Sequence, residues 1–219
     1  MWNSQVIVML LEGIRDTLYM TLASTLFGYI IGLPMGIVLT VTDKDGIRPN
    51  AAAYKVLDVI SNLLRSIPFI ILLIVLIPFT RFVVGRSYGS TATIVPLTIA
   101  AAPYIARMVE SSLKEVDAGV IEAARSMGAS DFQIVTRVML VEARTSLIVG
   151  ATISLGTILG YSAMAGTVGG GGLGDIAIRY GYTRWQTDIM VVTVVLLVIL
   201  FQIFQTIGMK IANRLDRRK

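Results

Sequence analysis

Two glycine-rich segments in this sequence match motifs of enzyme active sites. Residues 85–89 (G-R-S-Y-G) fit the pattern around a nucleophilic serine, and residues 169–174 (G-G-G-G-L-G) fit the dinucleotide-binding pattern G-x-G-x-x-G. The serine motif needs a histidine partner, but the chain contains no His. The dinucleotide motif must follow a β-strand, whereas this one follows a long apolar run. The sequence also lacks Cys and any G-x-x-x-x-G-K-[ST] segment. We therefore expect no catalytic residue, metal site, disulfide, cofactor or bound ATP in this chain.

The composition is that of a membrane protein. Of the 219 residues, 55% are hydrophobic and 15% are charged, whereas a soluble domain has about 25% charged residues. The mean hydropathy is +0.76. The net charge of +5 is compatible with nucleic-acid binding, but the basic residues are dispersed along a hydrophobic chain, which is typical of membrane topology. We expect an integral membrane protein that contacts lipid and no nucleic acid.

Five stretches are long and apolar enough to cross a membrane, which takes roughly 20 residues each. Four of them are free of charged residues, and the fifth is interrupted only by Arg65. The predicted fold is an all-α membrane protein in which residues 1–219 form a single transmembrane domain. The predicted spans are residues 17–42, 59–80, 87–106, 145–166 and 189–209.

The distribution of Lys and Arg predicts how the spans are oriented, because cytoplasmic loops are enriched in both. Five spans place the two termini on opposite sides of the membrane. With the C-terminal tail inside, the inner segments hold thirteen of the 19 basic residues and the outer segments hold five. The expected orientation is N-terminus outside and C-terminus in the cytoplasm.

Residues 107–144 are too polar to span a membrane, with eleven charged side chains, but they carry signals of helical structure. Asp117 can cap a helix that begins at the next residue, and Gly128 suits the position just after its end. Ser130 and Gln133 match a capping box that begins a second helix. Two short cytoplasmic helices are predicted, and a solvated loop on the lipid headgroups remains the alternative. The apolar stripe expected on the second helix consists of Phe132, Val135 and either Val138 or Met139.

Small residues and prolines mark helix contacts inside the membrane. Gly28, Gly32 and Gly36 lie on one face of the first span, where they allow another helix to approach closely. We interpret this ladder as a packing surface. In the third span, Pro96 and Pro103 are expected to break the helix.

Five residues are candidates for a translocation pathway. Arg65 would cost about 2.5–3.5 kcal/mol at the centre of a span, so it should face a cavity or a partner, or else extend to the interface from a helix end. Pro68 makes the same span irregular. Tyr161, Ser162 and Met164 offer a mixed polar and soft apolar surface that suits a thioether amino acid. Such side chains also occur, more often, where helices simply pack together.

The cytoplasmic insertion resembles a known family motif. Residues 122–124 (E-A-A), Gly128 and residues 138–140 (V-M-L) are similar to the EAA loop of ABC importer permeases, although Val141 stands where that family usually has proline. The resemblance implies a coupling helix that docks into a cytoplasmic ATPase subunit. The small side chains of the alanine pair would let this helix sit deep in the groove of that subunit. The implied coupling residues are Glu122, Ala123, Ala124, Arg125, Gly128 and Leu140.

Further segments extend the resemblance over nearly the whole chain and are most similar to the methionine branch of the family. They are residues 65–69 (R-S-I-P-F), 94–98 (I-V-P-L-T), 101–103 (A-A-P), 105–110 (I-A-R-M-V-E), 161–166 (Y-S-A-M-A-G) and 169–174. The resemblance implies a type I ABC importer permease in a bacterial plasma membrane. It further implies two copies of this chain, two ATPase subunits that bind ATP and Mg, and an extracytoplasmic, lipid-anchored binding protein.

The expected function is ATP-driven import of methionine (L- or D-) by alternating access, in which the chain itself has no enzymatic activity. A permease of the same class that carries another amino acid or a small oxyanion remains an alternative. A self-contained secondary transporter is less favoured, because the five spans show no inverted repeat and contain no acidic residue.

Overall fold

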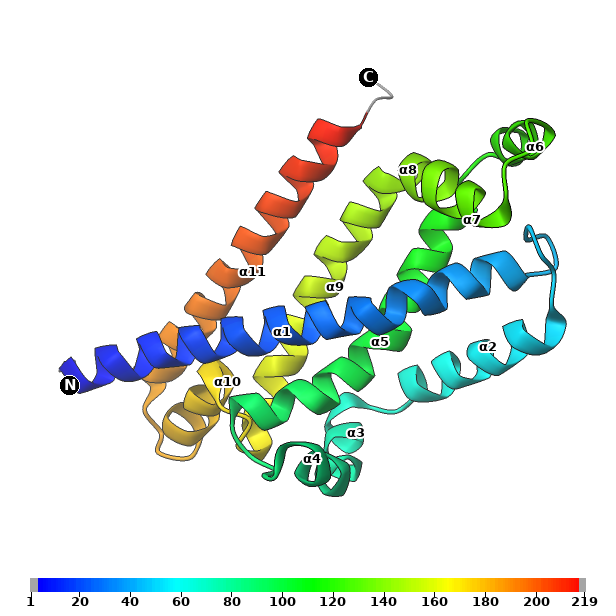
Figure 1. Cartoon of the computed structure of the whole chain (residues 1–219). Helices are drawn as coiled ribbons and strands as arrows, with labels where there is room; N and C mark the ends of the chain where they lie inside the picture. The colour runs from blue at the N-terminus through cyan, green and yellow to red at the C-terminus, as the bar shows by residue number, and fades with distance from the viewer. Residues whose placement is uncertain (1–3, 217–219) are drawn as a thin grey trace. The chain divides into compact units, whose positions relative to one another are not determined.

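The computed structural model describes residues 4–216, and all regular elements in this range are helices (Figure 1). The prediction of an all-α chain is confirmed. Within the described residues, four helical segments are long and apolar enough to cross a membrane, and α2 with α3 makes a fifth if the two are counted as one span. In chain order the elements are α1 (Ser4–Thr42), α2 (Ala51–Ser66), α3 (Phe69–Val75), α4 (Ile77–Val84), α5 (Ser90–Lys114), α6 (Ala118–Ser126), α7 (Asp131–Gln133), η1 (Ile134–Met139), α8 (Leu140–Glu142), α9 (Arg144–Ala165), η2 (Gly166–Val168), α10 (Gly172–Ile176), η3 (Ala177–Tyr182) and α11 (Thr187–Leu215).

The helices group into two compact units, and four long helices contribute a stretch to each of them. The first unit contains the chain up to Phe27, then residues 67–101 and 155–205. The second unit contains residues 28–66 and 102–154 and the chain from Thr206 onward.

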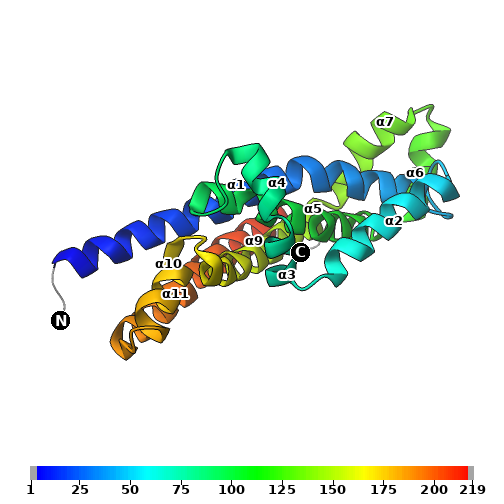
Figure 2. The ribbon, with the colours of Figure 1, turned by 90° about the horizontal axis from the view of Figure 1, so that it is seen from below.

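Two apolar clusters form the core of the first unit. In one of them, the rings of Phe69 on α3 and Tyr161 on α9 are stacked in parallel, with centroids 4.6 Å apart and an interplanar angle of 4°. In the other, Leu173 and Ile176 of α10 pack with Ile189 at the start of α11, and these two helices lie side by side in Figure 2. The first cluster also contains Met20, Leu73, Leu97 and Ala165, and the second also contains Leu10.

Both enzyme-like motifs form turns between helices in the first unit. Residues 85–89 connect α4 with α5, and residues 169–174 form the connection from η2 together with the first residues of α10, so neither follows a strand. The second turn needs glycine, because Gly169, Gly171 and Gly172 have φ angles of 77°, 84° and 74°. The Thr17 hydroxyl of α1 accepts a hydrogen bond from the Leu173 amide at 2.9 Å and holds this turn in place. The strand-to-helix geometry that either motif requires does not occur here.

The predicted second span, residues 59–80, is not one continuous helix. α2 ends at Ser66, and α3 begins after Pro68, which has the extended angles φ −54° and ψ 132°. Proline lacks an amide hydrogen and disfavours a helical conformation in the residue before it, so the chain breaks at this point. The opposite holds in α5, which continues through Pro96 and Pro103, and the predicted break there is wrong. Both prolines are buried, so packing around α5 compensates for the hydrogen bonds that they remove.

Two helices extend well beyond the predicted spans. α1 begins at Ser4, not at residue 17, and it accommodates charges that include the ion pair of Arg15 with Asp16 at 3.1 Å. α5 continues to Lys114, so the polar insertion begins after this residue and not at residue 107. The predicted spans end at charged residues, but both helices continue through such residues, so the charges do not mark the helix ends.

In the second unit, α1 packs closely on α5 through the predicted glycine ladder. An added Cβ at Gly32 would lie 2.6 Å from the carbonyl oxygen of Ala102, and one at Gly36 would lie 2.5 Å from that of Ala106. Gly28 is buried on the same helix. The two helices therefore approach to a distance that only glycine permits on the α1 side.

Replacing Gly36 by alanine is expected to lower the free energy of unfolding by about 1–3 kcal/mol, because the new methyl group would push against the backbone of α5. Denaturant unfolding of the full chain in detergent measures this loss. Gly160 in α9 is the matched control, since an added Cβ there meets no atom within 4 Å. Gly160→Ala should be neutral or stabilising by about 0.5–1 kcal/mol. Equal losses for the two variants would contradict the close approach.

Candidate functional site

The polar insertion folds into a helical hairpin, defined here as residues 117–139 and called the α6 hairpin. The Asp117 carboxylate caps α6 by accepting a hydrogen bond from the Gly119 amide at 2.7 Å. Gly128 follows the end of α6 with φ +80°, in the left-handed region. Ser130 and Gln133 form the reciprocal capping box that begins α7. The three predicted helix signals are confirmed, so this segment is helical.

The second helix of the hairpin buries Val135 and Met139 of the predicted apolar stripe, but not Phe132. Ile134, Val135 and Met139 are buried, whereas Phe132 is 77% exposed and Val138 is only half-buried. The prediction was wrong for Phe132 because residues 134–139 form the π-helix η1, whose wider turn changes which side chains share a face.

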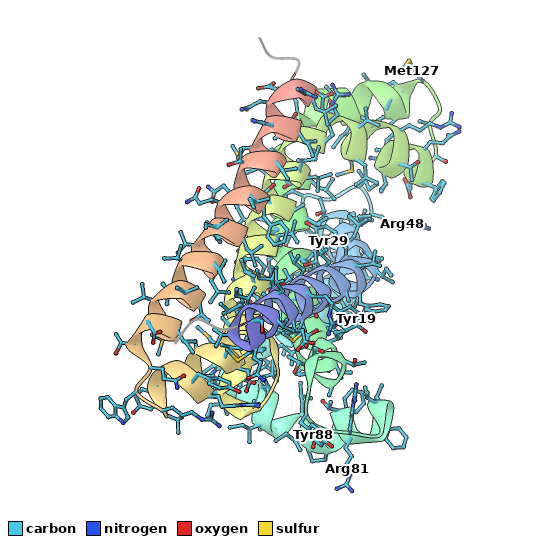
Figure 3. The ribbon with its side chains drawn as sticks, turned by 90° about the vertical axis from the view of Figure 1, so that its left-hand side faces the viewer. Tyr19, Tyr29, Arg48, Arg81, Tyr88 and Met127 are labelled. Carbon is cyan, nitrogen blue, oxygen red and sulfur yellow. The ribbon has the colours of Figure 1, made fainter. Side chains whose placement is uncertain are left out.

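The E-A-A segment of α6 presents one alanine and hides the other. Ala124 is 5% exposed, whereas Glu122, Ala123 and Arg125 are exposed to solvent. The expectation that both alanines face a partner is therefore corrected, because Ala124 packs inside the hairpin. Met127, at the end of α6, is 82% exposed and projects from the tip (Figure 3). The free surface of α6 thus combines a small residue, two charges and a flexible apolar side chain.

The loop between α1 and α2 supports the α6 hairpin from one side. The Arg125 guanidinium donates a hydrogen bond to the carbonyl oxygen of Ile47 at 2.8 Å. Arg48 lies 3.8 Å from the Asp131 carboxylate, but this pair is largely exposed and contributes little to stability. A cavity of about 320 Å³ lies where the loop, the end of α5 and the hairpin meet. Its lining includes Asp43, Ile47, Lys114, Ala118, Ile121 and Met139.

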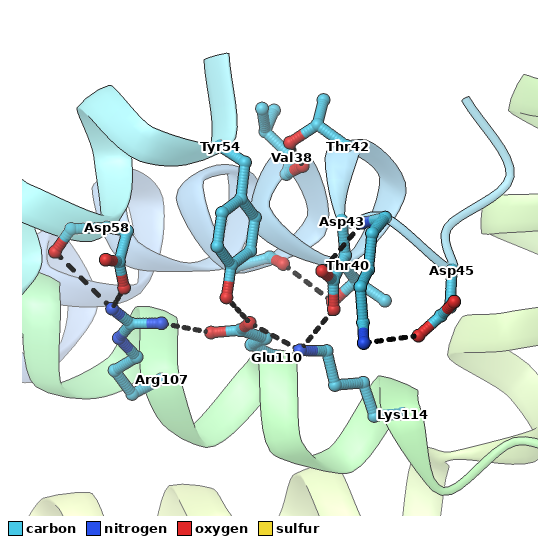
Figure 4. A network of polar contacts seen from close by, with 12 residues as sticks. Val38, Thr40, Thr42, Asp43, Asp45, Tyr54, Asp58, Arg107, Glu110 and Lys114 are labelled. Atoms are coloured by element: carbon cyan, nitrogen blue, oxygen red, sulfur yellow. Dashed lines mark hydrogen bonds and ion pairs between the residues drawn. The ribbon is translucent and has the colours of Figure 1, made fainter. Parts of the chain in front are cut away.

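A charge network lies beneath this loop, between α2 and the last turns of α5 (Figure 4). Its centre is Glu110, which is 6% exposed. The Arg107 guanidinium donates to the Glu110 carboxylate at 2.7 Å and also forms an ion pair with Asp58 of α2. The Tyr54 hydroxyl donates to Glu110 at 3.3 Å. Three charged groups and a phenol are therefore held together where most of their surface is withdrawn from water.

Lys114 extends the charge network to the loop after α1. Its ammonium group lies 2.8 Å from the Glu110 carboxylate and 2.7 Å from that of Asp43. The hydrogen bond from Lys114 lowers the pKa of Asp43 below its usual value and outweighs partial burial, which acts in the opposite direction. The charge network is defined as Asp43, Tyr54, Asp58, Arg107, Glu110 and Lys114.

The lowered pKa of Asp43 predicts a pH-dependent contribution to stability. A carboxyl group whose pKa is lower in the folded state stabilises the fold above its unfolded pKa of about 3.9, and this contribution is lost as the pH falls through the folded value. Asp43→Asn should therefore lower the melting temperature at neutral pH, and the difference from the unmodified protein should shrink below pH of about 4. Melting curves across the acid range measure this trend, and a difference independent of pH would contradict it.

The predicted pathway residues have different environments. Ser162 is 1% exposed and its hydroxyl donates to the Leu159 carbonyl oxygen of its own helix at 2.7 Å. Tyr161 is half-buried in its stack on Phe69, whereas Met164 is 46% exposed. Arg65 is exposed in the last turn of α2, where a cation interacts favourably with the helix C-terminus. Pro68 is exposed at the break before α3.

The charge network was not among the sites predicted from the sequence. A local signal existed, because Glu110 follows Arg107 by three residues and precedes Lys114 by four, so all three lie on one face of a helix. Asp58 and Asp43 come from other elements, and no local pattern predicts that they meet this face.

Comparison with known proteins identifies the family. Residues 28–219 match the binding-protein-dependent transport system inner membrane components. The chain belongs to this family. A probable D-methionine transport system permease protein MetI of Vibrio cholerae is 48% identical over 96% of this chain and 93% of its own length. The D-methionine transport system permease protein MetI of Escherichia coli K12 is 54% identical over 72% of this chain and 73% of its own length.

A solved structure agrees over the full fold. Inward-facing MetNI, described as a methionine ABC transporter, matches with a TM-score of 0.97 and 49% identity, covering 99% of this chain and 100% of that one. The family consists of membrane permeases, so the expected type I ABC importer permease fold and the absence of enzymatic activity in this subunit are confirmed. As a family member, the chain is an inner-membrane component of a transport system.

Proposed function

We propose that this chain is the permease through which an ATP-driven ABC importer carries methionine into a bacterial cell. The observation that carries this proposal is the agreement over almost the entire chain with proteins named as methionine transporters, at 48% sequence identity in one case and a TM-score of 0.97 in another. Both D- and L-methionine are cargo candidates. The alternative cargo is another amino acid or a small oxyanion. Competition between candidate solutes for uptake would distinguish these cargoes from methionine.

The α6 hairpin is the docking element for a cytoplasmic ATPase subunit. The EAA resemblance supports this role, as does the free surface of α6 around the exposed Glu122, Ala123 and Arg125. Gly128 fixes the turn after α6, and the half-buried Leu140 continues the motif in α8. A complete importer would contain two copies of this chain and two ATPase subunits, with ATP and Mg bound by the latter. An extracytoplasmic, lipid-anchored binding protein would deliver the substrate.

The second unit is built to transmit movement of the docked hairpin. α5 leads through three residues into α6, and Arg125 fastens α6 to the loop after α1. The charge network then joins this loop and α2 to α5 through Lys114 and Arg107. When ATP closes the ATPase subunits, these elements would move together as one body, which is the rigid-body step that alternating access requires.

The proposed orientation places the α6 hairpin and the C-terminus in the cytoplasm and the N-terminus outside. The distribution of Lys and Arg supports it. Among the pathway candidates, Met164 and Tyr161 retain exposed surface, and we place them with Arg65 and Pro68 along the route of the substrate. Ser162 is a packing residue in this proposal, because its hydroxyl is satisfied within α9.

Single-cysteine cross-linking tests the docking proposal, since the chain contains no native Cys. Ala123→Cys should cross-link to the ATPase subunit in membranes, because this side chain is exposed on α6. Ala124→Cys is the matched control, because Ala124 is only 5% exposed and a cysteine at this position should react poorly. No cross-link from Ala123→Cys, or equal yields from both positions, would contradict docking through this face.

A further inference from the structure

The turn between η3 and α11 holds a tryptophan in a strained and exposed position. Trp185 has φ +58° and is the one non-glycine residue with a positive φ among residues 4–216. A bulky L-residue rarely adopts this conformation. The indole side chain is nevertheless 86% exposed. The backbone conformation disfavours tryptophan at this position, and the side chain gains almost no burial within this chain to compensate.

The strained turn is fixed by its own backbone. The Trp185 amide donates to the Tyr182 carbonyl oxygen at 3.4 Å, and the Gln186 amide donates to that of Tyr180 at 3.2 Å. The Thr187 amide donates to the Trp185 carbonyl oxygen at 3.1 Å. These contacts fix the backbone at Trp185, so the exposure of this position is a feature of the turn itself.

The residues around Trp185 combine aromatic rings with a cation. Tyr182 is 69% exposed. The Arg184 guanidinium lies 4.5 Å from the centre of the Tyr180 ring, which keeps this cation beside the aromatic residues. Side chains of this kind, with an apolar body and a polar tip, favour the boundary between lipid chains and headgroups.

The position of Trp185 along the chain agrees with such a boundary. α11 begins at Thr187 and has an exposed aliphatic surface that includes Val191 (55% exposed), Val194 (48%) and Val198 (54%). Only 17% of its most apolar window is buried within the chain, and an exposed apolar surface of this length is typical of a helix side that faces lipid. Trp185 therefore lies just beyond the point where the lipid-facing surface of α11 begins.

A second segment at the same end of the first unit repeats the combination. Phe82 of α4 is 87% exposed and Tyr88 is 69% exposed, close in sequence to the exposed Arg81 and Arg86. In Figure 3, Arg81 and Tyr88 lie at the end of this unit at which α11 starts, and Figure 1 shows α4 at the same end. Two separate segments thus present exposed aromatic residues and arginines at the same end of the first unit.

We propose that Tyr182, Arg184 and Trp185 form an interfacial anchor that inserts into the headgroup region of the bilayer at the start of α11. The indole ring lies against the upper part of the acyl chains, with its N–H directed to the headgroups. The occupant of this surface is lipid, because the surface is continuous with the lipid-facing side of α11 and carries the cation that a phosphate-rich layer favours. A protein that covers the same residues is the competing outcome of the test.

Depth-dependent fluorescence quenching tests the anchor. The chain has two tryptophans, so Trp2→Phe leaves Trp185 as the sole reporter. The full chain is reconstituted into phosphatidylcholine vesicles whose lipids carry bromine near the glycerol end, at mid-chain or near the methyl end. Trp185 emission should lose most intensity with bromine near the glycerol end, and the loss should decline toward the methyl end. Acrylamide in the aqueous phase should quench it only in part.

A second reporter, placed in α11, calibrates the depth scale. In the Trp2→Phe, Trp185→Phe background, Val194→Trp places an indole on the lipid-facing side of α11, where mid-chain bromine should quench most strongly. Trp185 emission that is insensitive to all three brominated lipids but fully quenched by acrylamide would overturn the proposal in favour of a water- or protein-facing site. A Trp185 depth profile equal to that of Val194→Trp would also overturn it, since the side chain would then lie within the hydrocarbon core.

Discussion

Replacing Gly128 by proline is expected to abolish methionine transport while the ATPase subunit still hydrolyses ATP. Proline requires φ near −65°, whereas Gly128 has φ +80°, and proline also removes the hydrogen bond from the Gly128 amide to the Arg125 carbonyl oxygen at 2.9 Å. A cost of about 3 kcal/mol corresponds to a loss of roughly a hundredfold in the population of the native turn. Because the change is confined to the α6 hairpin, the membrane helices should remain folded. Uptake and ATP hydrolysis by the same reconstituted complex measure the two effects.

Gly128→Asn is the matched control for this prediction. Asparagine tolerates the left-handed region better than other residues, and an added Cβ at Gly128 meets no atom within 4 Å. Uptake by Gly128→Asn should therefore stay close to that of the unmodified protein. Normal uptake by Gly128→Pro would show that the geometry of this turn does not carry the coupling.

Replacing Glu110 by alanine is expected to give the largest loss of stability, about 3–5 kcal/mol. The change leaves Arg107, whose side chain is 17% exposed, with one fewer carboxylate, and it takes one of two partners from Lys114. Removing one member of a buried ion pair is costly because the remaining charge stays desolvated. Unfolding of the purified chain in detergent measures this loss. Glu110→Gln keeps a hydrogen-bond acceptor and should be less destabilising.

Asp45→Ala is the control for the Glu110 prediction. Asp45 forms an ion pair with Lys44 at 3.7 Å, but the two side chains are 81% and 85% exposed. Exposed pairs typically contribute between 0 and about 1 kcal/mol, so this variant should differ little from the unmodified protein. A loss as large as that of Glu110→Ala would mean that burial does not distinguish the charge network from surface pairs.

The parts of the fold that depend on short-range chemistry were predictable from the sequence. The caps at Asp117 and Ser130 and the turn at Gly128 each depend on side-chain and backbone groups within three residues of one another. The glycine ladder was likewise visible in the spacing along α1, and Gly32 and Gly36 indeed meet α5. Helix extent was less predictable, because α1 and α5 tolerate charged residues beyond their apolar stretches.

Features that depend on tertiary contacts could not be predicted from local patterns. The burial of Ala124 but not Ala123 depends on how α6 packs on η1, and the exposure of Phe132 depends on the π-helix that follows it. The ion pair of Asp58 with Arg107 joins residues 49 positions apart. The same limit explains the error at Pro96 and Pro103, since packing around α5 offsets what proline removes.

Uptake of labelled methionine into proteoliposomes tests most directly that this chain is a methionine-importing permease. The vesicles would hold the chain and its ATPase subunit with ATP inside and the binding protein outside. The expected result is ATP-dependent accumulation that excess unlabelled methionine abolishes. ATP hydrolysis stimulated by the binding protein without methionine uptake would contradict the proposed cargo, and failure of the chain to bind any ATPase subunit would contradict the role of the α6 hairpin.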